Sequence, residues 1–174
     1  MRTYVAKEKP VSIPVTTRLA SSASSAVLGL LLTVALGAQT AAPAMPPLKT
    51  RPTPQAVVDE HLDAINHCDW NRLMAQYPAD VQFFLPGGEV VKGRAAVGEL
   101  FRGFVKPAKE GGLCGVKFEA EHTFVVGGTI NVQWRATAPF LAETYRGADA
   151  YETRNGLMQA QVTTFQASQM KMKK

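Results

Sequence analysis

The chain has few of the residues that mark a dedicated chemical site. Its 174 residues include only two cysteines and three histidines. It has no His-Glu-x-x-His pair and no cysteine cluster, and it lacks both a phosphate-binding glycine loop and the Gly-x-Ser-x-Gly turn of many hydrolases. These absences argue against a metal centre, a nucleotide cofactor and a serine nucleophile. We therefore expect no metal and no cofactor.

An excess of one charge is also nearly missing. Lys and Arg total 19 against 14 Asp and Glu, which gives a formal net charge of +5. Most of that excess comes from Arg2, Lys7, Lys9 and Arg18, N-terminal to the first apolar run. Apart from the terminal KMKK, the remaining chain has no basic run of the kind that contacts phosphates. We expect no nucleic-acid binding.

A hydrophobic run long enough to span a membrane is absent too. The longest, Ala26 to Ala38, falls short of the roughly 20 residues that a spanning helix needs. A basic leader precedes it and the small-residue stretch AQTAAPA follows, an order typical of secretory signals. We predict a signal peptide over residues 1–37, or over 1–44 with cleavage before Met45. The mature protein would be periplasmic or secreted, without a stable membrane span, and an uncleaved membrane anchor is the alternative.

The two cysteines, Cys68 and Cys114, have two possible states. Export would permit a disulfide between them, because oxidising compartments preserve such bonds. The sequence does not say whether their two segments meet. It leaves open a disulfide or two separate thiols.

One folded domain is predicted between two irregular segments. Residues 38–52 are rich in proline without an apolar period, which indicates an extended, mobile linker. Residues 53–166 carry the periodic patterns and suffice for one core. Residues 167–174 show no pattern, so we expect a basic, solvated tail.

Within the domain, helix signals come first and strand signals last. Thr53-Pro54 predicts a capped helix that ends near His67, Asp69 caps a short second helix, and a third spans 94–106. Strands are predicted over 80–85 and 89–92 and in the alternating runs after Gly115. Helices followed by an antiparallel sheet give an α+β fold.

The first long hairpin determines where His122 points. The alternating runs 116–124 and 130–136 share an apolar face only if a three-residue loop, Val126 to Gly128, joins them. His122 then pairs with Val132 and lies on the apolar face. A histidine at such a position is either a packed core residue or an acid–base group.

The last hairpin determines where Asp149 points. Asn155-Gly156 between alternating runs predicts a two-residue turn, and counting outward places Asp149 opposite Val162 on the apolar face. A buried acid there requires a partner or a proton, which makes it a site candidate. The alternative is a position at the rim of the sheet, where Asp149 bonds a loop amide or water.

Four stretches of the chain carry a resemblance to a known family. They are VVDEHLDAINHCDWNRLMAQYPADVQFFLPGG, VKGRAAVGELFRGFV, VQWRATA and GADAYETRNGLMQAQVTTF. Their order and spacing over residues 54–165 resemble the nuclear transport factor 2-like superfamily, especially its SnoaL-like polyketide cyclase branch. The resemblance implies a cone-shaped α+β barrel in which three N-terminal helices pack on a curved antiparallel β-sheet around an apolar cavity.

The resemblance also implies candidate site residues. The superfamily includes ketosteroid isomerases, cyclases, epoxide hydrolases and many binding proteins. The isomerase tyrosine that binds the oxyanion falls on His61 here, the late-strand acid falls on Asp149, and the acid that moves the proton falls on Leu85. Because leucine is no base, the isomerase mechanism is not carried over. The expected ligand-lining side chains are Leu85, Phe101, Trp134 and Tyr151.

The sequence therefore predicts an exported domain that binds a small hydrophobic molecule, with no assigned reaction. One alternative is an acid–base enzyme of the isomerase, cyclase or hydrolase type that uses Asp149 with His61 or His122. Another is a protein-interaction module. Family members usually pair through their sheets, so we also expect a homodimer through the outward sheet face, with these side chains: Gln133, Arg135, Gln159, Gln161 and Thr163.

Overall fold

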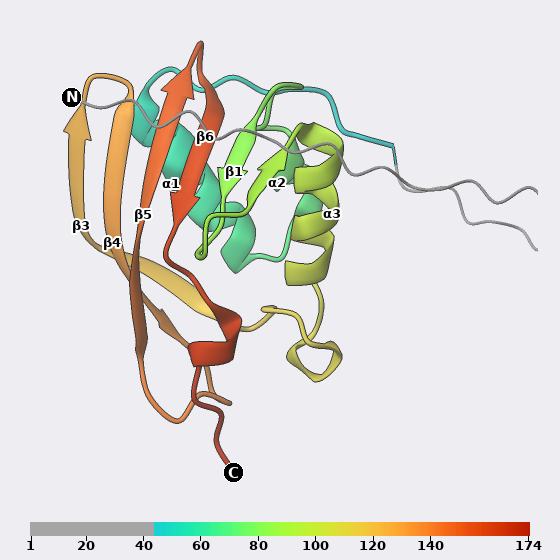
Figure 1. Cartoon of the computed structure of the whole chain (residues 1–174), viewed down its shortest axis with the longest axis vertical. Helices are drawn as coiled ribbons and strands as arrows, with labels where there is room; N and C mark the ends of the chain where they lie inside the picture. Colours follow the sequence, from blue (N-terminus) through green and yellow to red (C-terminus); the bar gives the residue numbers. More distant parts are fainter. Residues whose placement is uncertain (1–43) are drawn as a thin grey trace, which may run out of the picture. The chain divides into compact units, whose positions relative to one another are not determined.

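The computed structural model of the protein describes residues 44–174 (Figure 1). The predicted signal peptide, 1–37, lies outside the described residues, as does most of its longer version. Within residues 44–174, no helix is both long enough and apolar enough to cross a membrane.

The helices begin where the sequence predicts. They are α1 (Pro54–Asn66), α2 (Trp70–Met74) and α3 (Arg94–Phe104). The Thr53 hydroxyl accepts a hydrogen bond from the Ala56 amide at 3.1 Å, and the Asp69 carboxylate accepts from the Arg72 amide at 3.0 Å. The first cap fixes the start of α1, which carries His61, and the second fixes the start of α2.

Six strands form one sheet in the order β2-β1-β6-β5-β4-β3. The strands are β1 (Gln82–Phe84), β2 (Val90–Lys92), β3 (Lys117–Val126), β4 (Thr129–Thr137), β5 (Tyr145–Arg154) and β6 (Leu157–Thr163). α1 lies across β3 to β6, as Figure 1 shows. The α+β fold is therefore confirmed, with one correction: β1 pairs parallel to β6, so the sheet is mixed.

The hairpin of β5 and β6 contains a bulge that the sequence count missed. Near the turn the predicted pairs hold, since Arg154 pairs with Leu157 and Thr153 with Met158. The next pair is Glu152 with Ala160, so Gln159 is an extra residue on β6. A bulge advances the strand by one residue and so exchanges its two faces.

That exchange changes which side chains face the core. Asp149 lies on the inner face as predicted, but it pairs with Thr163 and not with Val162. Gln161 and Thr163, predicted to face outward, are buried, whereas Val162 is 49% exposed. Gln133 and Arg135 do face outward, as predicted.

The hairpin of β3 and β4 differs from the prediction in the same way. Ala120 pairs with Trp134 as expected, but Glu121 is an extra residue and Val126 pairs with Thr129 across a two-residue turn, Gly127-Gly128. The conflict between faces is thus resolved by a bulge and not by a longer loop. As a result His122 pairs with Gln133 and is exposed, so its predicted place on the apolar face was wrong.

Both terminal segments of the described chain are attached to the domain. Residues 45–52, here called the N-terminal strap, form backbone hydrogen bonds with the domain. The Lys49 amide donates to the Ala75 carbonyl at 2.8 Å, and the Arg51 amide donates to the Gly156 carbonyl at 2.9 Å. The C-terminal segment is mostly exposed and is attached as well, because the Ala142 amide donates to the Lys171 carbonyl at 2.8 Å.

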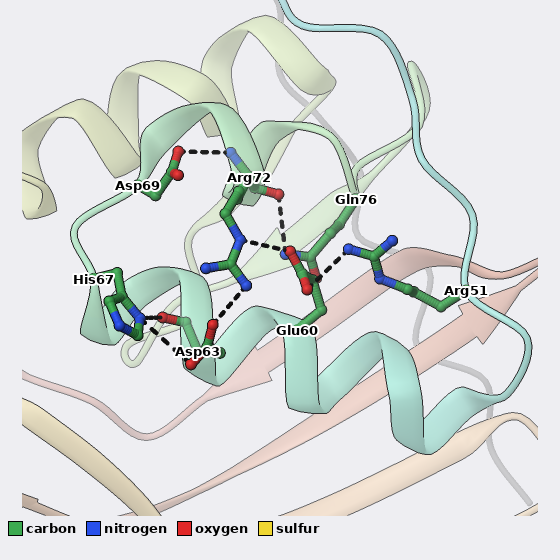
Figure 2. A network of polar contacts seen from close by, with 7 residues as sticks. All are labelled: Arg51, Glu60, Asp63, His67, Asp69, Arg72 and Gln76. Atoms are coloured by element: carbon green, nitrogen blue, oxygen red, sulfur yellow. Dashed lines mark hydrogen bonds and ion pairs between the residues drawn. The ribbon is translucent and has the colours of Figure 1, made fainter.

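A network of ion pairs joins the strap to α1 and α2 (Figure 2). The Glu60 carboxylate binds Arg51 and Arg72, each at 2.8 Å, and Arg72 also binds Asp63 at 2.6 Å. The hydrogen bond from Arg72 holds the pKa of Glu60 below its usual value. Because these groups are partly exposed, each pair stabilises the fold by at most about 1 kcal/mol.

Cys68 and Cys114 form a disulfide. It joins the turn after α1 to the loop after α3, two segments 46 residues apart in sequence. The structure thus selects the bridge over the two separate thiols, the alternatives that the sequence left open.

Candidate functional site

A buried carboxylate lies at the centre of the inner sheet face. The Asp149 side chain is 9% exposed and accepts three hydrogen bonds. The Thr163 hydroxyl donates to Oδ1 at 2.8 Å, while the Tyr151 hydroxyl and the Gln161 amide donate to Oδ2 at 3.0 and 3.2 Å. Strand register explains the cluster, because Thr163 pairs with Asp149 and Gln161 with Tyr151.

A chain of hydrogen bonds connects this carboxylate to His61. The Gln161 amide nitrogen donates to Asp149, so its oxygen accepts from the Tyr77 hydroxyl at 3.2 Å. Tyr77 also lies 3.2 Å from Nδ1 of His61. Tyr77 has one hydroxyl proton and donates it to Gln161. In the contact with His61 the Tyr77 oxygen is therefore the acceptor, and Nδ1 of His61 carries the proton. Nε2 of His61 is then a proton acceptor.

An apolar cavity adjoins these polar groups. The space open to the centre of a water-sized sphere is about 50 Å³, enough for a few waters. Its lining includes His61, Asp149, Tyr151, Gln161 and Thr163. The remaining walls are Leu62, Ile65, Phe83, Leu85, Phe101, Phe104, Leu113, Phe118, Trp134 and Phe165.

Burial sets the protonation state of the histidine and the tyrosines. It lowers the pKa of His61 from 6.5 to about 4, so the imidazole is neutral at pH 7. It also raises the pKa of Tyr77 and Tyr151 well above 10, and the nearby Asp149 charge adds to the effect. Both tyrosines therefore keep their protons.

Two opposed effects act on Asp149. Burial raises the pKa of its carboxyl above 3.8, whereas the hydrogen bonds from Thr163, Tyr151 and Gln161 and the nearby N–H of Trp134 favour the carboxylate. Burial has the larger effect, so the pKa of Asp149 is raised. The site thus holds a neutral histidine and an acid that accepts a proton more readily than an exposed aspartate.

His61 should make the protein sensitive to acid. Its pKa is about 4 in the folded chain against 6.5 for the free group, so the unfolded state binds a proton first as pH falls. Above pH 6.5 the neutral His61 does not oppose folding. Between pH 6.5 and pH 4 it lowers the free energy of unfolding by about 3 kcal/mol in total. We expect His61→Gln to remove this part of the pH dependence in urea unfolding between pH 4 and 7.

The comparison with a variant is needed because Asp149 acts in the opposite sense. Its raised pKa favours the folded state at acid pH, so the total slope is a sum of the two groups. The exposed His122, which does not line the cavity, provides the matched control substitution, His122→Gln. Equal slopes for His61→Gln and the parent would contradict the expected role of His61.

The structure brings together most of the side chains predicted for the site. His61 and Asp149 line one cavity, connected through Gln161 and Tyr77. The predicted ligand-lining residues Leu85, Phe101, Trp134 and Tyr151 line it as well. His122 does not join them, because the bulge at Glu121 turns it outward.

Three polar residues of the cluster were missed. The sequence predicts Gln161 and Thr163 on the outer face, and it does not single out Tyr77. The signal that would have found the first two is Asp149 itself: a buried acid needs donors, and β6 supplies them only if its register shifts. For Tyr77 the sequence holds no comparable signal.

Residues 44–174 contain no group of three His, Cys, Asp or Glu side chains placed to hold a metal ion. The chemistry that the described side chains offer is proton exchange and hydrogen bonding within an apolar enclosure.

Comparisons with known proteins agree with this fold. The family model of the SnoaL-like domain matches residues 58–161. No curated protein matches the chain.

Among solved structures, an NTF2-like protein of unknown function from Cytophaga hutchinsonii is 15% identical, with a TM-score of 0.53 over 70% of this chain and 96% of that one. A ketosteroid isomerase candidate from Kribbella flavida is 20% identical, with a TM-score of 0.52 over 63% and 75%. SalBIII, an epoxide hydrolase/cyclase-like enzyme in salinomycin pyran ring formation, is 17% identical, with a TM-score of 0.55 over 69% and 95%. At such identities the likeness concerns the fold alone.

Proposed function

Because this chain belongs to the SnoaL-like domain family of the nuclear transport factor 2-like superfamily, we propose that it binds a small, mainly apolar molecule in the cavity beside Asp149. The observation that carries the proposal is one polar cluster, held by hydrogen bonds, in an otherwise apolar enclosure. Apolar walls with a few placed polar groups are typical of ligand sites. The walls supply affinity, and the Asp149 cluster orients the ligand.

The size of the cavity limits the ligand. A space of about 50 Å³ is smaller than the roughly 150 Å³ that holds benzene in an engineered protein cavity. A ring-sized ligand therefore has to displace side chains. We expect the wall residues that are only partly buried to move first: Leu62, Ile65, Leu85, Phe104 and Phe165.

Blocking the cavity tests the proposal. The cavity-lining Leu85 is only partly buried, so Leu85→Trp would fill the space at a modest cost in stability. We expect the parent to bind cyclohexanol or methylcyclohexane in calorimetric titrations, and Leu85→Trp to lose that binding. Val126→Trp, at a side chain 74% exposed, adds the same indole outside the cavity and should bind like the parent. If neither compound binds the parent, the proposal is wrong.

An acid–base enzyme of the isomerase, cyclase or hydrolase type is the second candidate. It is favoured by the hydrogen-bonded chain from Asp149 to a neutral His61, because the two groups differ in their readiness to take a proton. Leu85 still stands where an isomerase has its proton-moving acid. We therefore rank binding first.

Export remains part of the proposal. The Cys68–Cys114 disulfide supports it, because such bonds persist mainly in oxidising compartments. Cleavage before Ala38 or Met45 would also keep the whole strap. Sequencing the mature N-terminus from the native host should give Ala38 or Met45, whereas an intact Met1 chain in the cytosol would contradict export.

We also propose that the protein forms a homodimer through the outer face of the sheet. One row of paired residues crosses that face from β3 to β2 and is mostly apolar: Phe124, Asn131, Ala150, Val162, Phe84 and Val90. Phe124 and Val162 are 57% and 49% exposed, which is unusual for large side chains in one row. A dimer contact would remove these two apolar side chains from water, and this burial would favour dimer formation.

Sedimentation at micromolar concentration should show a dimer, and Val162→Glu should convert it to a monomer, because the glutamate would bury a charge in the contact. Leu48→Glu is the matched control: Leu48 is 46% exposed but lies in the strap. A monomeric parent would contradict the dimer.

A further inference from the structure

A buried donor in the cavity has no acceptor in hydrogen-bonding geometry within residues 44–174. The indole N–H of Trp134 makes no hydrogen bond among the described residues, although the side chain is only 2% exposed. Trp134 lines the same cavity as Asp149. Leaving such a group unsatisfied costs about 1–3 kcal/mol, so a native protein retains one mainly where a ligand or water completes it.

The indole has little freedom to turn elsewhere. It packs against Phe118, Tyr145 and Phe165, with ring centroids 5.4, 5.7 and 6.2 Å away. It also lies over Gly147, where a Cβ atom would collide with the ring. The N–H is near enough to Asp149 to favour its carboxylate form, yet its geometry falls short of a hydrogen bond.

Asp149 has acceptor capacity left. A carboxylate offers about four lone-pair positions. Oδ2 accepts from Tyr151 and Gln161, whereas Oδ1 accepts only from Thr163. One position on Oδ1 is unoccupied by any described residue, so the cavity presents one donor and one acceptor.

We infer that the polar end of the ligand is a neutral hydroxyl group, which accepts from the Trp134 N–H and donates to Asp149 Oδ1. This inference rests on the proposed binding function and specifies its ligand class. A hydroxyl both donates and accepts, so it satisfies both groups at once. A ketone satisfies only the indole, a hydrocarbon satisfies neither, and a carboxylate would meet a like charge in a water-poor space.

Three probes of similar shape test the inference at pH 7.5: cyclohexanol, cyclohexanone and methylcyclohexane. Each net hydrogen bond contributes roughly 1 kcal/mol, so we expect cyclohexanol to bind the protein about 5-fold or more tighter than either of the others. In ¹⁵N-edited NMR spectra, the indole N–H resonance of Trp134 should move downfield with cyclohexanol and not with methylcyclohexane. Gly98 accepts the N–H of the other tryptophan, Trp70, which serves as the internal control.

Trp134→Phe removes the donor and should reduce the preference for cyclohexanol over methylcyclohexane. Because this variant can repack or fail to fold, the NMR measurement on the parent decides independently. If all three probes bind equally and the Trp134 resonance does not respond, the hydroxyl inference is wrong while the binding proposal stands. Tighter binding of cyclohexanone also overturns it. If no probe binds, both are wrong.

Discussion

Breaking the Cys68–Cys114 disulfide is expected to lower the free energy of unfolding by about 4 kcal/mol. The bond closes a loop of 46 residues, and the entropy that such a loop removes from the unfolded chain corresponds to about that energy at 25 °C. Domains of this size have a total stability of roughly 5–15 kcal/mol, so the loss is a large share. The measurement is urea unfolding of the oxidised protein against the Cys68→Ser, Cys114→Ser double variant.

The sequence contains no other cysteine, which gives the experiment an internal control. Adding reductant to the parent should reproduce the stability of the double variant, and adding it to the double variant should change nothing. A parent whose unfolding midpoint is the same with and without reductant would show that the bond does not form or does not stabilise the fold.

Replacing Asp149 by leucine is the second change with a large expected effect. It leaves three buried donors, on Tyr151, Gln161 and Thr163, without their acceptor. Unsatisfied donors cost about 1–3 kcal/mol each, so a loss of about 3 kcal/mol or more is expected. Asp149→Asn should cost only about 1 kcal/mol, because the amide oxygen can accept from Tyr151 and Gln161 while its NH₂ group donates to Thr163.

Thermal or urea unfolding of both variants measures this difference. Asp80→Leu makes the same chemical change at an exposed position and should alter the stability by no more than about 0.5 kcal/mol. If Asp149→Leu were as stable as Asp149→Asn, the expectation would be wrong. The hydrogen bonds to the carboxylate would then contribute less to stability than removal of the buried acid.

The helices were predictable because their signals are local. Thr53-Pro54 and Asp69 carry cap chemistry that acts within a few residues, and the structure uses both caps. The Asn155-Gly156 turn is local in the same sense, and it set the first pairs of its hairpin correctly. Asp149 reached the inner face as predicted, although the predicted partner was wrong.

The errors arose where the structure depends on distant contacts. No residue type near Glu121 or Gln159 indicates a bulge, because the two bulges follow from packing across the sheet. The parallel pairing of β1 with β6 joins segments far apart in sequence, and the attachment of the strap depends on partners such as Gly156. Local patterns carry no information on such pairings.

The bulge at Gln159 determines how β6 responds to a change of length. Because Gln159 is the residue without a partner, deleting it would join Met158 directly to Ala160 and leave Gln161 opposite Tyr151 and Thr163 opposite Asp149. The donors to Asp149 would therefore survive the deletion. A slip of one residue that closed the bulge at unchanged length would have the opposite result, because Val162 would turn inward and Gln161 and Thr163 would reach the solvent. The strand can thus lose one residue at Gln159 without exchanging its faces, whereas a slip of the same size would place Asp149 against a hydrocarbon wall.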